Sequence, residues 1–149
     1  MKIKLCFINF VLLLIALHIS ACNPNKSISP EAERFEKVLK QNVSENYQLD
    51  GDYKYVLWNE NSCHGCKVKS INILNKLRPQ NVKIIAPNSD KKLASNIDSQ
   101  FVIIDRHNEF GKYYYGVSNI GIVNIKNGKV TMIKNYNVDE MDKFETDLQ

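Results

Sequence analysis

The sequence lacks a block of basic residues. Its 149 residues include 20 Lys and Arg against 16 Asp and Glu, a formal net charge of +4, and the two signs are interspersed along the chain. Proteins that bind nucleic acid concentrate positive charge in a patch or stripe. We therefore expect no nucleic-acid partner. The chain also shows no internal repeat, and residues 22–149 have the size of one ordinary domain.

The chain also lacks an apolar run that would cross a bilayer comfortably, which takes about 20 residues. Its apolar run over residues 5–17 is interrupted by Asn9, follows Lys2 and Lys4, and precedes small residues that end at Cys22. A basic start, a short apolar run and small residues, in that order, are typical of a secretory signal. The sequence thus predicts an exported protein.

Residues 19–22, Ile-Ser-Ala-Cys, resemble the lipobox of bacterial lipoproteins, in which the signal is cut before the cysteine and the cysteine is acylated. The resemblance implies a signal peptide over residues 1–21, a lipid such as palmitate on Cys22, and a polar tether over residues 22–29. The protein would then be anchored to a membrane of the cell envelope and face the periplasm. The alternatives are an ordinary signal peptide cut near Ala21 and an uncleaved anchor.

Cysteine is scarce, with four in the chain. Cys6 would leave with the signal and Cys22 would carry lipid, so Cys63 and Cys66 remain as free thiols. An exported compartment is oxidising, so this CxxC pair forms a disulfide unless something reduces it. The pair can be a redox couple, an inert structural disulfide or part of a metal site.

The sequence offers few further ligands for a metal. It has no second CxxC and no HxxxH, so a Cu(I) or Zn site would need His64 or His107 beside the two thiolates. The motif of c-type haem attachment requires His at the position of Lys67, which excludes that function. No TxxC motif indicates a peroxidase. We expect no metal and no organic cofactor.

Apolar periodicity and turn residues predict an α/β protein with a mixed central sheet. Ser29 is the expected N-cap of a helix that starts at Pro30, and Asn127-Gly128 is the preferred turn of a β-hairpin. The expected elements are helices over 30–43, 63–78, 90–98, 108–116 and 138–148, strands over 52–58, 81–86 and 100–105, and the hairpin over 120–136. Strand, helix and strand in succession imply a parallel pair with a right-handed crossover.

Two further side-chain environments follow from the same patterns. The three consecutive tyrosines Tyr113–Tyr115 are expected to pack the predicted helix over 108–116 onto the sheet, although they could instead line a substrate groove. Asp105 and Arg106 are expected in a surface turn.

Three stretches, "YVLWNENSCHGCKVKSINIL", "FVIIDRHNEFGKYYYGV" and "NIKNGKV", resemble the thioredoxin-like superfamily. The order and spacing of these three stretches are similar to those in membrane-anchored thiol-disulfide oxidoreductases of the TlpA/ResA type, over roughly residues 50–148. The resemblance implies a thioredoxin-like domain over residues 30–149 with an N-terminal helical extension. It also implies exchange with the disulfides of other exported proteins, and a thiol-disulfide partner in the membrane that donates or accepts electrons.

The resemblance and the helix geometry assign roles to the two cysteines. Cys63 would lie at a helix N-terminus, where unpaired N–H groups and the helix dipole favour thiolate, and would attack a partner disulfide. Cys66, one turn further, would resolve the mixed disulfide. His64 can stabilise the thiolate if it is protonated or can be solvated and idle. Glu60 is a candidate proton acceptor, and Lys67 can favour thiolate but is expected to be simply exposed.

The sequence also departs from the family pattern. Leu57 stands where the family has a buried acid, Ser62 replaces an aromatic residue and Gly65 replaces a proline. The substrate loop before the hairpin, residues Asn119, Ile120 and Gly121, lacks the expected cis-proline. These departures keep open a second class, a redox-inactive binding or scaffold lipoprotein on the same fold.

Overall fold

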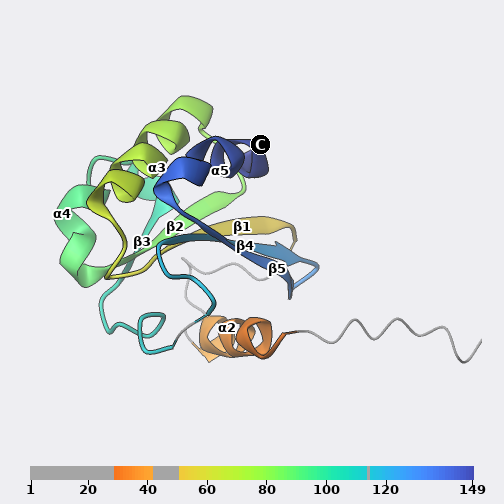
Figure 1. The fold of residues 1–149 in the computed structure, drawn as a ribbon. Coiled ribbons are helices and arrows are strands. Elements are labelled where there is room, and N and C mark those ends of the chain that lie inside the picture. Colours follow the sequence, from red (N-terminus) through yellow and green to blue (C-terminus); the bar gives the residue numbers. More distant parts are fainter. Residues whose placement is uncertain (1–28, 42–50, 114) are drawn as a thin grey trace, which may run out of the picture.

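The computed structural model describes residues 29–41, 51–113 and 115–149, and within them it confirms an α/β fold with a mixed five-stranded sheet flanked by helices (Figure 1). The longer helices are α2 (Pro30–Gln41), α3 (His64–Leu77) and α5 (Met141–Leu148), and α4 (Lys91–Ala94) is a single turn. The strands are β1 (Tyr53–Trp58), β2 (Val82–Pro87), β3 (Val102–Asp105), β4 (Ile120–Lys126) and β5 (Lys129–Tyr136). Short 3₁₀ turns are η1 (Asn88–Asp90), η2 (Ser99–Phe101) and η3 (Val138–Glu140).

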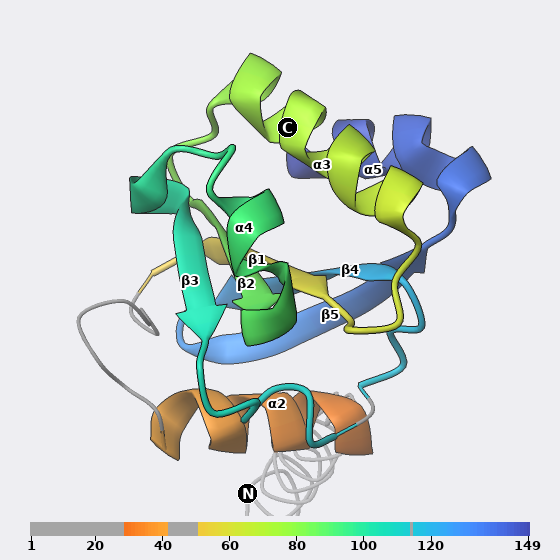
Figure 2. The same ribbon diagram turned by 90° about the vertical axis from the view of Figure 1, so that its left-hand side faces the viewer.

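The sheet has the order β3-β2-β1-β4-β5, which places β1 at its centre. β1 pairs in parallel with β2, and β2 with β3, whereas β4 and β5 run antiparallel. The three parallel strands therefore end at the same edge of the sheet (Figure 2). Because β1 is covered on both faces, its last four residues are all buried.

Helices cover both faces of the sheet. In Figure 1, α3 and α5 lie on one face and α2 lies on the opposite one. The core under α3 and α5 includes Val56, Trp58, Leu74, Ile84 and Phe144. The core under α2 is rich in aromatic rings, and includes Phe35, Tyr55, Phe110 and Tyr115. This division follows the strand periodicity, because alternate residues of β1 point to opposite faces.

The predicted helix start and hairpin turn are confirmed. The Ser29 hydroxyl accepts a hydrogen bond from the Ala32 backbone N–H at 3.2 Å, which caps α2. Asn127 and Gly128 both have positive φ, at 51° and 74°, as a type I′ turn requires. The apolar residues Ala32, Phe35, Val38 and Leu39 of α2 are buried, and residues 42 and 43 of the predicted helix lie outside the described residues.

The predicted helix over 108–116 is wrong. The described residues of this segment form turns, with Asn108 in the left-handed region at φ 52°. Its rings accordingly pack differently: Tyr115 contacts Phe35 of α2 edge-on, with centroids 5.3 Å apart, and Tyr113 is 46% exposed. The periodicity was misleading because aromatic residues anchor a loop onto α2 as readily as they anchor a helix.

The expected surface turn at Asp105 and Arg106 is also only half right. Arg106 is exposed, but Asp105 is 4% exposed and its two carboxylate oxygens accept the Glu109 and Phe110 backbone N–H groups at 2.8 Å each. A carboxylate that holds two backbone donors organises the turn, which explains why it is buried. The predicted last helix over 138–148 is shorter in the structure, because Val138 is 49% exposed and belongs to η3, and α5 starts at Met141.

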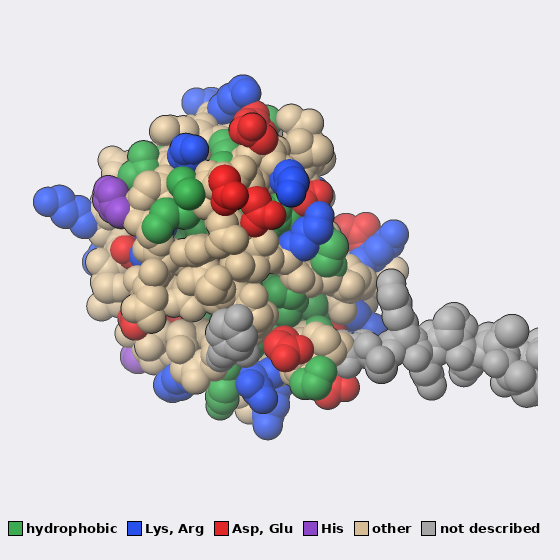
Figure 3. All heavy atoms as spheres, in the orientation of Figure 1, with side chains coloured by type: hydrophobic (Ala, Val, Ile, Leu, Met, Phe, Trp, Pro, Cys, Tyr) green, Lys and Arg blue, Asp and Glu red, His purple; other side chains and the backbone are tan. Residues whose placement is uncertain are grey.

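The surface carries interspersed charges. On the face drawn in Figure 3, Lys and Arg lie among Asp and Glu without a large area of one sign. Among the described residues, no helix is long and apolar enough to span a membrane. The predicted signal peptide, the lipidation site Cys22 and the tether up to residue 28 lie outside the described residues.

Candidate functional site

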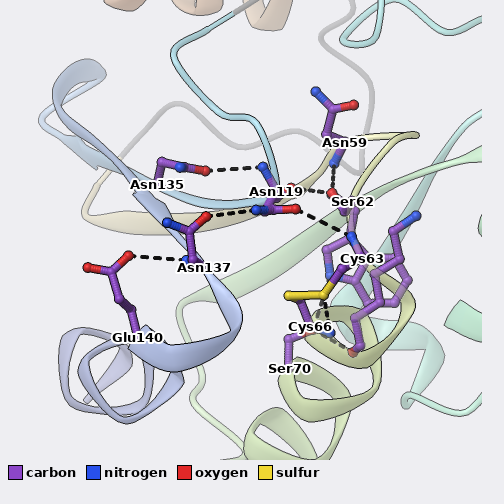
Figure 4. Close-up of a disulfide and its surroundings, with 11 residues drawn as sticks. Asn59, Ser62, Cys63, Cys66, Ser70, Asn119, Asn135, Asn137 and Glu140 are labelled. Atoms are coloured by element: carbon purple, nitrogen blue, oxygen red, sulfur yellow. Dashed lines mark hydrogen bonds between the residues drawn. A yellow bond between two sulfur atoms is a disulfide. The ribbon is translucent and has the colours of Figure 1, made fainter.

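Cys63 and Cys66 form a disulfide at the N-terminus of α3, directly after the central strand (Figure 4). Cys63 is the N-cap residue and is exposed, whereas Cys66 lies in the first turn and is 1% exposed. Their Cα atoms are 5.3 Å apart, and the Cys66 backbone N–H lies 3.0 Å from the Cys63 Sγ. The sequence correctly predicted a CxxC at the start of a helix.

The local environment favours negative charge on Cys63. The helix that it caps is 14 residues long, and the Cys66 backbone N–H in its first turn points toward the Cys63 Sγ. The Cys66 and Lys67 backbone N–H groups both donate to the Cys63 carbonyl, at 3.1 and 3.2 Å. In the reduced state, the Cys66 N–H that now faces Cys63 Sγ would stabilise a thiolate there. Cys66, by contrast, is buried inside the protein.

The loop before Cys63 is fixed by Asn119, a member of the predicted substrate loop. The Asn119 carbonyl accepts the Asn59 backbone N–H at 3.2 Å and the Ser62 hydroxyl, and its side-chain Oδ1 accepts the Cys63 N–H at 3.4 Å. Figure 4 shows Asn119 beside the disulfide. Ile120 and Gly121, the other two predicted residues of this loop, are instead buried at the start of β4.

A chain of asparagines continues from Asn119 to the last helix. Asn135 Oδ1 accepts the backbone N–H groups of Ser118 and Asn119 at 3.1 and 3.2 Å, and Asn119 Nδ2 donates to Asn137 Oδ1 at 2.8 Å. Asn137 forms a capping box with Glu140 before α5. The backbone N–H and carbonyl of Asn119 are thus both used within the protein. No cis peptide bond occurs among the described residues.

Lys67 is buried, whereas the sequence predicted that it is exposed. Its side chain is 4% exposed, and its Nζ lies 2.5 Å from Asp90 Oδ2 and 3.3 Å from the Glu60 carbonyl. Helix periodicity explains the burial, because Lys67 lies on the same face of α3 as Ser70, Ile71 and Leu74. The cation therefore needs a partner, and Asp90, from the end of η1, supplies it.

The other predicted tuning residues lie at the surface. His64 and Glu60 are exposed, and Glu60 contacts Lys67 through its backbone carbonyl. Leu57, at the position where the family has an acid, is packed in the core under α2. On the other face, Trp58 Nε1 donates to the Ser70 hydroxyl at 3.1 Å, which in turn donates to the Lys67 carbonyl at 2.7 Å. This chain ties β1 to α3 just behind Cys66.

Within the described ranges, no three His, Cys, Asp or Glu side chains come together as a metal site. The alternative in which His64 or His107 joins the two cysteines around Cu(I) or Zn thus receives no third ligand from these residues.

Sequence reasoning missed Asp90, Asn135 and Asn137. Asp90 lies 23 residues from Lys67, and Asn135 lies 16 residues from Asn119. Only the pairing of β4 with β5, which puts Gly121 opposite Asn135, brings the asparagines together. The one signal in the sequence was the unusual number of Asn residues near the hairpin. That number does not predict which of them lie together.

No family model matches the chain, and no curated protein matches its sequence. The fold and the site therefore define only a coarse class: an α/β protein with a CxxC disulfide at a helix N-terminus, compatible with the thioredoxin-like fold and with a redox function.

Proposed function

We propose that this protein is an exported, lipid-anchored thiol-disulfide oxidoreductase of the TlpA/ResA type. It exchanges disulfides with other exported proteins through Cys63 and Cys66. A thiol-disulfide system in the membrane supplies or removes the electrons, and the redox-active disulfide is the only redox group that the reaction needs. The signal-like start and the lipobox-like Cys22 support the location in a bacterial cell envelope.

The observation that carries the proposal is the difference in exposure between the two sulfurs at one helix end. Cys63 is exposed at the N-cap of α3, where a thiolate is stabilised, whereas Cys66 is buried one turn further. An attacking cysteine must reach a partner disulfide, and a resolving cysteine must reach only its neighbour. The arrangement thus supports Cys63 as nucleophile and Cys66 as resolving residue. An inert disulfide would have no need for one exposed sulfur at a helix N-terminus.

Two observations favour the second candidate, a redox-inactive binding lipoprotein. Leu57 occupies the position of the family's buried acid, and the Asn119 backbone groups that would face a substrate are bonded internally. Lys67 and Asp90 offer a different buried ionisable pair one residue after Cys66, which supports the oxidoreductase instead.

The deciding experiment is a redox titration of the full-length protein in detergent micelles, equilibrated with glutathione or dithiothreitol after metal removal. We expect a reversible two-electron transition. A midpoint near −250 mV or lower would indicate a reductant, and one near about −120 mV an oxidant with His64 as the residue to test. After reduction, Cys63 should alkylate quickly near neutral pH and Cys66 slowly.

Two variants make the titration specific. Cys66→Ser should trap a mixed disulfide with a partner through Cys63, and Cys63→Ser should trap none. If the wild-type pair does not cycle, or if both thiols alkylate at the same rate, the oxidoreductase is contradicted and the binding lipoprotein takes its place. Replacement of Cys22 by Ser should remove the protein from the membrane fraction and abolish its labelling with palmitate.

A further inference from the structure

The loop that carries Asn119 brings backbone N–H groups close to the exposed sulfur. The Asn119 side-chain Oδ1 accepts the Cys63 backbone N–H at 3.4 Å, so the backbone of residues 118 and 119 lies beside the disulfide (Figure 4). A polypeptide joined to Cys63 in a mixed disulfide therefore passes close to this loop. Backbone N–H groups at a surface can bind an extended chain by donating to its carbonyl oxygens. This loop is thus the natural place for main-chain recognition of a substrate.

These N–H groups are already occupied by a side chain. Asn135 Oδ1 accepts the backbone N–H groups of Ser118 and Asn119 at 3.1 and 3.2 Å, and Asn135 Nδ2 donates to the Ser118 hydroxyl oxygen at 3.1 Å. A carboxamide carries the same kinds of acceptor and donor as a peptide group. The Asn135 side chain therefore makes the hydrogen bonds to this loop that a peptide group of a substrate would make.

The contact lies at the surface of the protein. Ser118 is exposed and Asn135 is half-buried, so the hydrogen bonds between them are not sealed inside the core. Asn135 belongs to β5, where it pairs with Gly121 of β4, and the next residue, Tyr136, is 3% exposed. The strand therefore holds the backbone of Asn135 in place, whereas its side chain needs only a rotation about its own bonds to leave the loop.

The carbonyl groups of the same loop are held from the other side. The Asn119 carbonyl accepts the Asn59 backbone N–H at 3.2 Å and the Ser62 hydroxyl, and the Val117 carbonyl accepts Asn59 Nδ2 at 3.0 Å. These donors belong to the loop after β1, so their loss would disturb the segment that leads into the disulfide. The hydrogen bonds from Asn135 can be exchanged without such a disturbance.

We propose that Asn135 determines the specificity of this site, because its carboxamide takes the place of a substrate peptide group. This inference rests on the proposed function. A substrate gains main-chain hydrogen bonds at the loop only by displacing Asn135, which exchanges two hydrogen bonds for two of the same kind and so adds little to binding. Disulfides that reach Cys63 without main-chain pairing lose nothing. The favoured substrate class is therefore small or surface-exposed disulfides rather than disulfides within an extended strand.

The reaction with either kind of disulfide is balanced without another reactant. The Cys63 thiolate attacks one sulfur of the substrate disulfide, which releases the first substrate thiolate and leaves a mixed disulfide. The Cys66 thiolate then attacks the Cys63 sulfur and releases the second. The protein loses two electrons and forms its disulfide, and the substrate gains two electrons and two protons. Main-chain pairing at the loop affects only how the substrate is held during these steps.

The test compares two uncharged disulfides in single-turnover reactions with the reduced full-length protein in detergent micelles. One is the symmetrical disulfide of the peptide acetyl-Gly-Cys-Gly-amide, and the other is hydroxyethyl disulfide, which has no peptide group. The measured quantity is the ratio of their second-order rate constants, peptide over hydroxyethyl disulfide. A change in the reactivity of the Cys63 thiolate affects both rate constants and cancels in this ratio.

Two substitutions of Asn135 should move the ratio in opposite directions. Asn135→Ala removes the competing carboxamide and should raise the ratio about tenfold, since two hydrogen bonds become available to the peptide. Asn135→Asp places a carboxylate there, which holds the two N–H groups more strongly and should lower the ratio below that of wild type. Asn75→Ala, a matched change on α3 where Asn75 Nδ2 donates to the Asn96 carbonyl at 3.1 Å, should leave it unchanged. If Asn135→Ala leaves the ratio at the wild-type value or lowers it, the inference is overturned and the proposed function stands.

A second measurement does not depend on turnover. In the Cys66→Ser variant, Cys63 can be linked chemically either to the peptide or to mercaptoethanol, and NMR can follow the exchange of the Asn135 side-chain amide protons with water. We expect these protons to be protected in the mercaptoethanol adduct and unprotected in the peptide adduct, whereas the Ser118 and Asn119 backbone N–H groups stay protected in both. If neither disulfide reacts with the reduced wild type but the adducts differ in this way, the proposed function is wrong and the assignment of Asn135 holds. Equal protection of the Asn135 protons in the two adducts would show that the assignment is wrong.

Discussion

Lys67 brings a positive charge into the interior one residue after Cys66. Its contacts with Asp90 and with the Glu60 carbonyl join three segments around the disulfide: α3, η1 and the loop after β1. An ion pair of this kind is sensitive to the loss of one member, because the remaining charge stays buried without compensation. The ion pair therefore holds α3, η1 and the loop after β1 in place around the disulfide.

Replacement of Lys67 by Met should lower the free energy of unfolding by about 3 kcal/mol, because Asp90, whose side chain is 17% exposed beside Lys67, would lose its cation. Urea unfolding of the oxidised protein measures this. Lys76→Met is the control: Lys76 is 71% exposed and pairs with Glu145 at 2.7 Å, so its loss should cost less than about 1 kcal/mol. Adding Asp90→Asn to Lys67→Met should restore part of the stability. Equal losses for the two lysines would contradict a buried, structural pair.

At the scale of elements, the start of β4 decides how the site is held. Gly121 pairs with Leu57 of β1 and with Asn135 of β5, so β4 connects the strand before Cys63 to the asparagines of the hairpin. A Cβ built on Gly121 would overlap the Val117 side chain and lie 3.2 Å from the Lys134 carbonyl oxygen. Only glycine fits this close approach without movement of the loop that carries Asn119.

The change Gly121→Ala should therefore destabilise the protein by about 1–3 kcal/mol, as overpacking of a core does. Gly65→Ala makes the same chemical change in α3, where a Cβ would meet nothing within 4 Å. There alanine should stabilise by about 0.5–1 kcal/mol, because it restricts the unfolded chain and favours the helix. Thermal unfolding of the two oxidised variants should move in opposite directions. A shift of the same sign in both would argue against the close approach at Gly121.

The elements also show how far sequence can predict this protein. Local signals were sufficient for α2, α3 and the hairpin, because a cap, an apolar stripe or a turn pair defines each of them within a few residues. They failed for the segment after β3, where Asp105 binds two backbone N–H groups and Tyr115 packs on α2. Those contacts join distant residues, and no local periodicity encodes them.

The same limit applies to the candidate site. Cys63 and Cys66 were predictable, because their spacing and the helix start lie within one short stretch. The environment of Lys67 was not, because Asp90 reaches it only through the fold. The contact between Asn119 and Cys63 was equally hidden, since the two residues are 56 positions apart in the sequence. Chemistry carried by one motif can be predicted from sequence, whereas chemistry shared between elements requires the structure.

At the scale of the whole molecule, the C-terminal helix is fastened to the sheet by Asp147. Its carboxylate accepts from Lys134 Nζ and from the Tyr136 hydroxyl, both at 2.6 Å, and its carbonyl accepts from Lys54 Nζ at 2.8 Å. The hydrogen bonds from Lys134 and then Tyr136 hold the pKa of Asp147 below its ordinary value of 3.8. Asp147 thus links α5 to the central strand β1 and to the edge strand β5.

Because the pKa of Asp147 is lowered by folding, its contribution to stability is present above its ordinary value of 3.8 and is lost as the pH falls through the folded value. Asp147→Asn should lower the free energy of unfolding by about 0.5–1 kcal/mol at pH 7, since the cluster is partly exposed. The difference from wild type should shrink below about pH 4. Urea unfolding at several pH values checks this, with Asp139→Asn in η3 as control. A difference that does not depend on pH would contradict the assignment.

Two hydrogen bonds between residues far apart in the sequence have a consequence for how the chain folds. Glu36 Oε1 accepts the Val130 backbone N–H at 2.6 Å across 94 residues, and Lys54 reaches Asp147 across 93. The first hydrogen bond can form only after the hairpin, and the second only after α5, has left the ribosome, or the export channel if the chain is secreted. Until then these two contacts are missing, and contacts this distant in sequence make folding slow. The residues of β5 and α5, which emerge after α2 and β1, are thus the ones that complete these contacts.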